Sequence, residues 1–169
     1  MKLNKIISKF FSRKSFEKIK PDDKNESKLQ INEFDENSEV LKINQIGITP
    51  FGQGALILKT NNGIEFPISA FSPETAKSIS DFQKGKRNEI PSIYNMLEQI
   101  CEASGLLLVK VRIYASGDVL RANLYFTGKN ELILRNYRAS DAIALAVFYN
   151  IPILIKKSLL EQSSKMKTK

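Results

Sequence analysis

Residues 138 to 141 hold three side chains that can act on a phosphate group. They are Arg138, Ser140 and Asp141, and an apolar run follows them directly. The free backbone N–H groups at the start of a helix can hold a phosphate together with a guanidinium, and Asp141 can orient water or ligate a divalent cation. A structural explanation competes with this one and needs no substrate: Ser140 can cap the helix and Asp141 can complement its dipole.

Glu74 is the second candidate carboxylate. The run Ser72-Pro73-Glu74 predicts a helix start, because Ser caps, Pro fits the first helical position and Glu favours the helix dipole. Glu74 and Asp141 can handle water or a cation such as magnesium only if the fold brings them within about 4 to 6 Å of one site. The metal itself stays unknown from the sequence.

Basic residues form two further groups. One lies at the break between the first two predicted helices and consists of Lys84, Lys86 and Arg87. The other follows a predicted strand, where Lys110, Arg112 and Tyr114 share one side-chain parity. Both groups can attract phosphates, and the tyrosine can stack on a base. An ordinary solvated surface explains them as well, and we favour it for the strand.

The composition excludes several kinds of chemistry. The chain has no histidine, which removes Ser/His/Asp and Cys/His catalysis and the usual neutral-pH general base. The single cysteine, Cys101, cannot form an internal disulfide, so we expect a reducing, cytoplasmic setting. The net charge of +8 favours polyanionic partners.

The charge is distributed in blocks, which predicts three regions. Residues 1–20 carry a net charge of +6 and residues 21–40 a net charge of −5. We therefore expect a basic then acidic, poorly ordered N-terminal segment over 1–38, a folded domain over 39–162 and a basic tail over 163–169. Within residues 1–20, apolar residues recur at helical spacing: Leu3, Ile6, Ile7, Phe10 and Phe11. That helix either docks on the domain or frays, which we favour, or makes weak contact with a membrane surface or nucleic acid.

Ten elements are needed to position these residues. Strands are predicted at 40–48, 55–60, 64–70, 106–115, 119–127, 131–136 and 152–155, and helices at 73–84, 90–103 and 140–149. Asn62-Gly63 is the strongest turn signal and predicts a hairpin. The order β-β-β-α-α-β-β-β-α-β groups the helices instead of alternating them with strands. The expected fold is therefore α+β, with a mixed, mostly antiparallel sheet and three helices.

The segment around Asp141 resembles the bifunctional nuclease family, whose signature reads approximately Asp-x-Arg-Pro-Ser-Asp-Ala-Ile-x-Leu-Ala followed by a Pro-Ile strand. The matching residues are Arg138, Ser140, Asp141, Ala142, Ile143, Leu145, Ala146, Pro152 and Ile153. Upstream, Phe66-Pro67-Ile68 followed by Glu74 is similar to a second family motif. The resemblance spans roughly residues 40 to 160 and implies the family's fold and cleavage of DNA and RNA.

Two single positions and one three-residue stretch depart from the family pattern. Its leading acid falls on Asn136, its proline on Ala139, and a Thr-His-Asp stretch is replaced near Ser92-Ile93-Tyr94. The resemblance implies a nuclease in which Asp141, Glu74 and Arg138 act on a phosphodiester, with Ser140, Asn136 and the basic groups binding DNA or RNA. If the replaced residues are needed for cleavage, the domain instead binds or scaffolds without cutting. Self-association is a further expectation, because small open sheets often pair at their edges.

Overall fold

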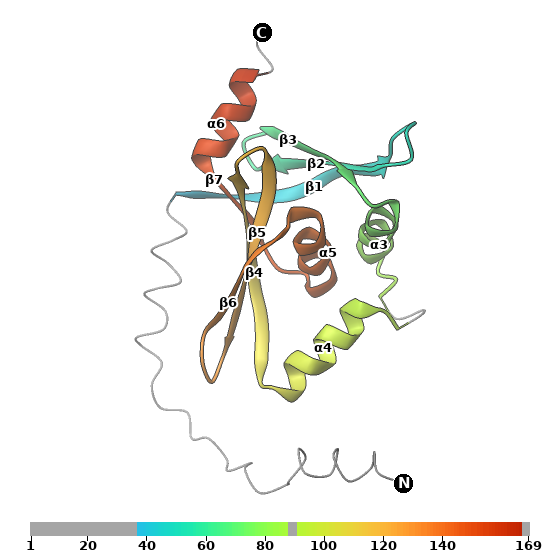
Figure 1. Ribbon diagram of the computed structural model, residues 1–169, viewed down its shortest axis with the longest axis vertical. Helices are drawn as coiled ribbons and strands as arrows, with labels where there is room; N and C mark the ends of the chain where they lie inside the picture. The colour runs from blue at the N-terminus through green and yellow to red at the C-terminus, as the bar shows by residue number, and fades with distance from the viewer. Residues whose placement is uncertain (1–36, 88–90, 167–169) are drawn as a thin grey trace, which may run out of the picture. The chain divides into compact units, whose positions relative to one another are not determined.

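The computed structural model describes residues 37–87 and 91–166 (Figure 1), and side chains as far as residue 163. The predictions for the N-terminal segment over residues 1–36, its amphipathic helix included, lie outside the described residues, as does the end of the basic tail.

The described residues form one seven-stranded sheet. Its strands are β1 (Ser38–Ile48), β2 (Gly54–Thr60), β3 (Glu65–Phe71), β4 (Leu106–Ser116), β5 (Val119–Gly128), β6 (Leu132–Arg138) and β7 (Ile153–Lys156). They are ordered β3-β2-β1-β7-β4-β5-β6, and β7 pairs parallel to β4 and antiparallel to β1. The other strand pairs are antiparallel, which confirms the α+β fold with a mixed, mostly antiparallel sheet.

The helices in this part of the chain are α3 (Pro73–Gln83), α4 (Ile93–Ala103), α5 (Ala139–Tyr149) and α6 (Lys157–Met166). The sequence predicts the first three and misses α6. The apolar signal of α6 is short, because only Leu159 and Leu160 are large apolar residues in its first two turns. Leu160 is nevertheless buried, and α6 packs against β7.

Two predicted local signals are confirmed. Gly63 adopts a left-handed conformation with φ 87° in the β2–β3 hairpin, and its backbone N–H donates to the Thr60 carbonyl. At the start of α3, the Thr75 N–H donates to the Ser72 hydroxyl oxygen at 3.1 Å, and Pro73 occupies the first helical position.

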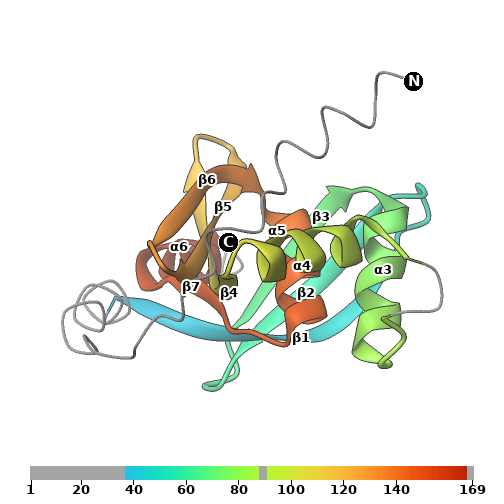
Figure 2. The same cartoon turned by 90° about the horizontal axis from the view of Figure 1, so that it is seen from below.

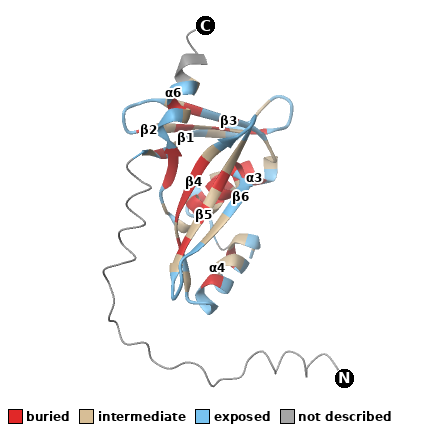
Figure 3. Ribbon diagram, turned by 60° about the vertical axis from the view of Figure 1, so that its left-hand side comes forward, coloured by how far each residue is buried: buried red, intermediate tan, exposed pale blue. Residues whose placement is uncertain are grey.

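The sheet is curled, and Figure 1 shows β1, β2 and β3 crossing β4, β5 and β6 at a steep angle. Helix α5 packs against β4, β5 and α3, and Figure 2 shows α4 in front of it and α3 beside it. Its residues Ala142, Ile143 and Ala144 are fully buried. Figure 3 shows the buried residues concentrated along the strands and α5, whereas α4 is largely exposed.

One predicted surface is wrong. Lys110 and Arg112 on β4 are buried, with 5% and 9% of their surfaces exposed, so they do not form a solvated face. β4 is an interior strand between β7 and β5, and long basic side chains can lay their aliphatic parts along a sheet. The Lys110 ammonium lies 5.2 Å from the centre of the Tyr125 ring, which is within the range of a cation–π contact.

Candidate functional site

The β6–α5 junction positions Arg138, Ser140 and Asp141. β6 runs into α5 without a loop, so Arg138 is both the last strand residue and the residue that precedes the helix, with an extended backbone (φ −63°, ψ 135°). The helix begins at Ala139, one residue earlier than predicted. Ser140 therefore lies inside the first turn, where it is buried, and the prediction that it caps the helix is wrong.

Arg138 and Asp141 form an ion pair at this junction. The Arg138 Nε–H donates to Asp141 Oδ2 at 2.7 Å, and the two side chains remain 68% and 34% exposed. A guanidinium has five N–H donors, so this bond leaves the donors on its two terminal nitrogens for other oxygen atoms. An exposed ion pair adds little stability by itself, and its value here is that it orients both groups.

Tyr94 of α4 is a site residue that the sequence did not single out for chemistry. Its ring packs edge-on against Phe82 (centroids 4.9 Å apart) and stacks on Phe148 (5.9 Å). Burial and then the Asp141 carboxylate raise the pKa of Tyr94, whereas Ser78 and Arg138 act in the opposite direction. Tyr94 stands in the stretch that departs from the family pattern, and this was the only available signal.

Glu74 lies in the first turn of α3. Helices α3 and α5 pack together, and the Phe82–Phe148 contact brings their carboxyl-terminal ends together. Glu74 lines a groove of about 590 Å³ between α3 and β1, together with Ile46 and Lys77. Hydrogen bonds from its own backbone N–H and from Ser72 lower the pKa of its carboxyl.

A second concavity, the edge pocket, includes the α5 entrance. It is lined by residues 67–71, 118–121 and 138–140 and has a volume of about 530 Å³. Arg138 and Ser140 therefore belong to a different concavity from Glu74. The structure brings Arg138, Ser140 and Asp141 together at one helix start and places Glu74 in the groove beside α3.

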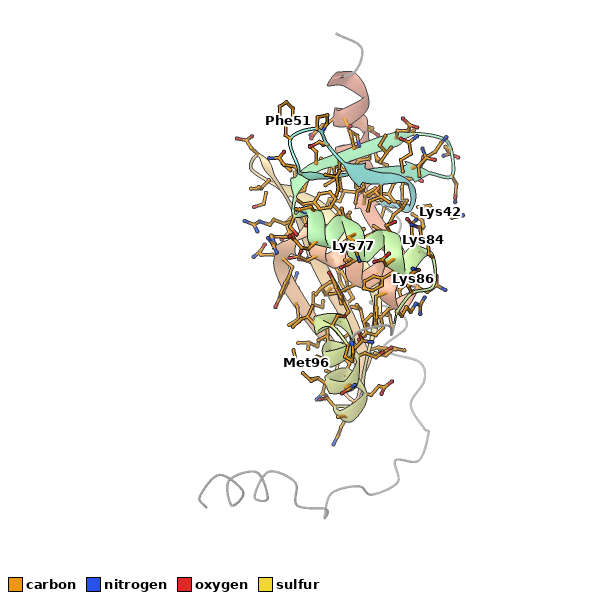
Figure 4. All side chains as sticks on the ribbon, turned by 90° about the vertical axis from the view of Figure 1, so that its right-hand side faces the viewer. Lys42, Phe51, Lys77, Lys84, Lys86 and Met96 are labelled. Carbon is orange, nitrogen blue, oxygen red and sulfur yellow. The ribbon has the colours of Figure 1, made fainter. Side chains whose placement is uncertain are left out.

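The other predicted binding residues lie elsewhere. Lys84, Lys86 and Arg87 follow the last turn of α3, about 15 Å along that helix from Glu74. Figure 4 shows Lys77 on the outer side of α3 and Lys84 and Lys86 at its carboxyl-terminal end. These three residues are thus distant from the first turn of α3, and Arg112 is buried in the sheet.

Asn136 has a structural role in β6. It takes a left-handed backbone conformation (φ 66°) at an irregularity in the pairing of β6 with β5. Asparagine tolerates this conformation better than most residues. The Tyr114 hydroxyl donates to Asn136 Oδ1, and the Asn136 N–H donates to Asn123 Oδ1 at 3.4 Å.

The described side chains do not form a cage for a divalent cation. Among them, His, Cys, Asp and Glu never gather in a group of three that could hold a metal ion. Asp141 Oδ2 already accepts the Arg138 hydrogen bond. The residues at the α5 entrance therefore do not fit a preformed magnesium site.

Comparison with known families decides the relationship. A family model of the bifunctional nuclease domain matches residues 56–168, which is more than half of the chain. The chain belongs to the bifunctional nuclease domain family. No curated protein matches it. The matched part of the chain contains Glu74, Tyr94, Arg138 and Asp141. Strand β1 precedes the matched residues, although it is an interior strand of the sheet.

Membership in this family gives the chain a nuclease-like, nucleic-acid-related function. Among residues 37–87 and 91–166, none of the helices has the length and apolar character that crossing a membrane requires.

Proposed function

We propose that this domain hydrolyses phosphodiester bonds in DNA or RNA at the entrance of α5. The observation that carries the proposal is the exposed Arg138–Asp141 pair, joined at 2.7 Å at a helix start within a bifunctional nuclease domain. Free backbone N–H groups at such a start favour a phosphate.

Arg138 supplies the positive charge. Its Nε–H is bound to Asp141, so the two terminal amino groups remain to contact the non-bridging oxygens of a phosphate. Negative charge builds on those oxygens as water attacks phosphorus. A cation fixed in place before the reaction stabilises that charge more than it stabilises the ground state.

Asp141 supplies the base. Its Oδ2 holds Arg138, and its Oδ1 is the atom that accepts a proton from water. The water oxygen forms a bond to phosphorus while the bond from phosphorus to one ribose or deoxyribose oxygen breaks. The departing oxygen takes a proton from solvent, so one phosphate end and one hydroxyl end result.

A second candidate is a domain that binds nucleic acid without cutting it. Two observations favour it. Asp141 Oδ2 already accepts a hydrogen bond from Arg138, and the described residues include no group of three that could hold a metal ion. Such a domain would bind DNA or RNA with an affinity that falls as salt rises, and the product of an extended incubation would still be the intact strand.

Cleavage of end-labelled DNA and RNA by the purified full chain, with and without added Mg²⁺, tests the first candidate. We expect Asp141→Asn and Arg138→Gln each to reduce the rate at least about 100-fold, because each removes a group that acts in the transition state.

Asp81→Asn is the matched control for this test. It breaks the Lys77–Asp81 pair, which is another solvent-accessible ion pair between residues close in sequence, at 2.8 Å, and we expect unchanged cleavage. Equal cleavage by Asp141→Asn and Asp81→Asn would contradict the proposal. A wild-type chain that binds both nucleic acids but cuts neither would establish the second candidate.

Three sequence-based expectations remain proposals. They are a cytoplasmic location, association of the chain with itself, and a weak contact of residues 1–20 with a membrane surface. Sedimentation of the full chain tests the second, and flotation with anionic lipid vesicles tests the third.

A further inference from the structure

The edge pocket joins parts of the sheet that are far apart in strand order. β3 and β6 are the two edge strands of the sheet, yet residues 67–71 of β3 and residues 138–140, where β6 ends and α5 begins, line the same concavity. The curl of the sheet brings these edges together, and Asp118 of the β4–β5 turn and residues 119–121 of β5 complete the lining. The proposed chemistry uses Arg138 at one end of this pocket and none of the β3 or β5 residues that line it.

Two arginines that line the edge pocket occupy paired positions on neighbouring strands. Arg121 of β5 and Arg138 of β6 are register partners, and both line the pocket. Side chains at directly paired positions lie on the same face of a sheet, and like charges there are destabilising. Asp141 balances the charge of Arg138, so Arg121 is the cation whose charge a bound anion would balance. Asp118, which also lines the pocket, is the carboxylate nearest to Arg121 in the sequence.

Apolar side chains line a further part of the pocket, beside the polar Ser69, Asp118 and Ser140. Pro67, Ile68, Phe71, Val119 and Leu120 line it, and Val119 is 54% exposed. The Phe71 ring is closely backed by Gly54, where an added Cβ atom would lie 2.6 Å from the ring. The concavity therefore combines a cationic end with a firm apolar wall, and its volume of about 530 Å³ is that of a small-ligand site.

We infer that the edge pocket holds one nucleotide of a single strand, with Arg121 as a second phosphate ligand beside Arg138. The phosphate lies between the two guanidinium groups and the base lies against the apolar wall. A duplex keeps its bases stacked and paired inside, so it offers this wall only backbone. The inference rests on the proposed function, because a nucleotide bound in this pocket would place the next phosphodiester bond of the strand beside Arg138.

Binding of a fluorescent oligothymidylate to the full chain carrying Asp141→Asn tests the inference without turnover. Replacing Arg121 with Gln should weaken binding about tenfold, the effect of losing one charge-assisted contact. Replacing Asp118 with Asn should strengthen binding, because it removes a negative charge from the rim. Arg135→Gln is the matched control, since Arg135 is an exposed arginine of β6 that does not line the pocket, and it should leave the affinity unchanged.

The inference is overturned if Arg121→Gln binds like Arg135→Gln while both variants melt at the wild-type temperature. It is also overturned if a duplex of the same length binds as tightly and depends equally on Arg121, or if polyglutamate competes as well as an unlabelled single strand.

The two proposals fail in different ways. Arg121-dependent binding by a wild-type chain that cannot cleave leaves the pocket in place and removes the hydrolysis. Cleavage with an unchanged KM in Arg121→Gln keeps the hydrolysis and removes the pocket.

Discussion

The Arg138 guanidinium has one side committed to the protein and one side open to a ligand. Its Nε–H is held by Asp141, and the side chain is still 68% exposed. An arginine fixed in this way loses less conformational entropy on binding than a freely rotating one. At the scale of single residues, this fixed orientation is what suits Arg138 to hold a phosphate at the α5 entrance.

Two half-buried tyrosines make the stability of the domain depend on pH in the alkaline range. Burial, followed by nearby Cys101, raises the pKa of Tyr149 far above its ordinary value, and burial also raises the pKa of Tyr94. A tyrosine with a raised folded-state pKa contributes its full stability below the unfolded value of about 10. Above that pH the unfolded state loses its proton first, so stability falls as pH rises.

We therefore expect the thermal midpoint to fall between about pH 10 and pH 11.5, and to fall less steeply in Tyr149→Phe. Circular dichroism melts across this range measure it. Tyr137→Phe, at a position that is 45% exposed, should keep the wild-type slope. Identical slopes for both variants would show that burial of Tyr149 does not set the pH dependence.

Helix α5 acts as the element that positions the site. Its amino-terminal turn carries Ser140 and Asp141, while Ala142, Ile143 and Ala144 are fully buried against its neighbours. Alanines let the helix approach the sheet closely, and such an interior tolerates little added volume.

Enlarging one of these alanines tests this packing. Ala144→Leu should destabilise the domain by about 1–3 kcal/mol because the added atoms find no space. Ala103→Leu, on the exposed end of α4, should change stability little. Urea unfolding measures both, and equal stability of the two variants would contradict close packing around α5.

Local signals in the sequence predicted most elements and fewer of the site contacts. Asn62-Gly63 and Ser72-Pro73 determine their turn and helix start through chemistry confined to a few residues, and both were predictable. The predicted start of α5 was one residue too late, because β6 continues directly into the helix and no side chain caps its first turn. The burial of Arg112 and the approach of Tyr94 to Asp141 depend on packing between distant segments, and strand periodicity carries no information on either.

For the whole molecule, the basic residues that attract nucleic acid are distinct from the residues proposed to cleave it. The full chain carries +8, and Lys84, Lys86 and Arg87 stand at the carboxyl-terminal end of α3 while the Arg138–Asp141 pair stands at the start of α5. Phosphate contacts away from the α5 entrance add affinity and salt dependence without touching the reacting bond.

Replacing Lys84, Lys86 and Arg87 together with Gln should raise KM and leave kcat unchanged. It should also reduce the slope of log affinity against log salt by about 0.7 for each lost contact with a single strand. Titrations at several salt concentrations measure the slope, with Lys129→Gln on the β5–β6 turn as the single-charge control. A reduced kcat with an unchanged slope would place these residues in the reaction itself.

The position of β7 has a consequence for biosynthesis. This four-residue strand joins β3-β2-β1 to β4-β5-β6, although its residues follow all the others of the sheet in the chain. A nascent polypeptide cannot unite the two halves before Lys156 has left the ribosome. Until then, β1 and β4 each have an edge without a strand partner, which chaperones and other copies of the chain can reach.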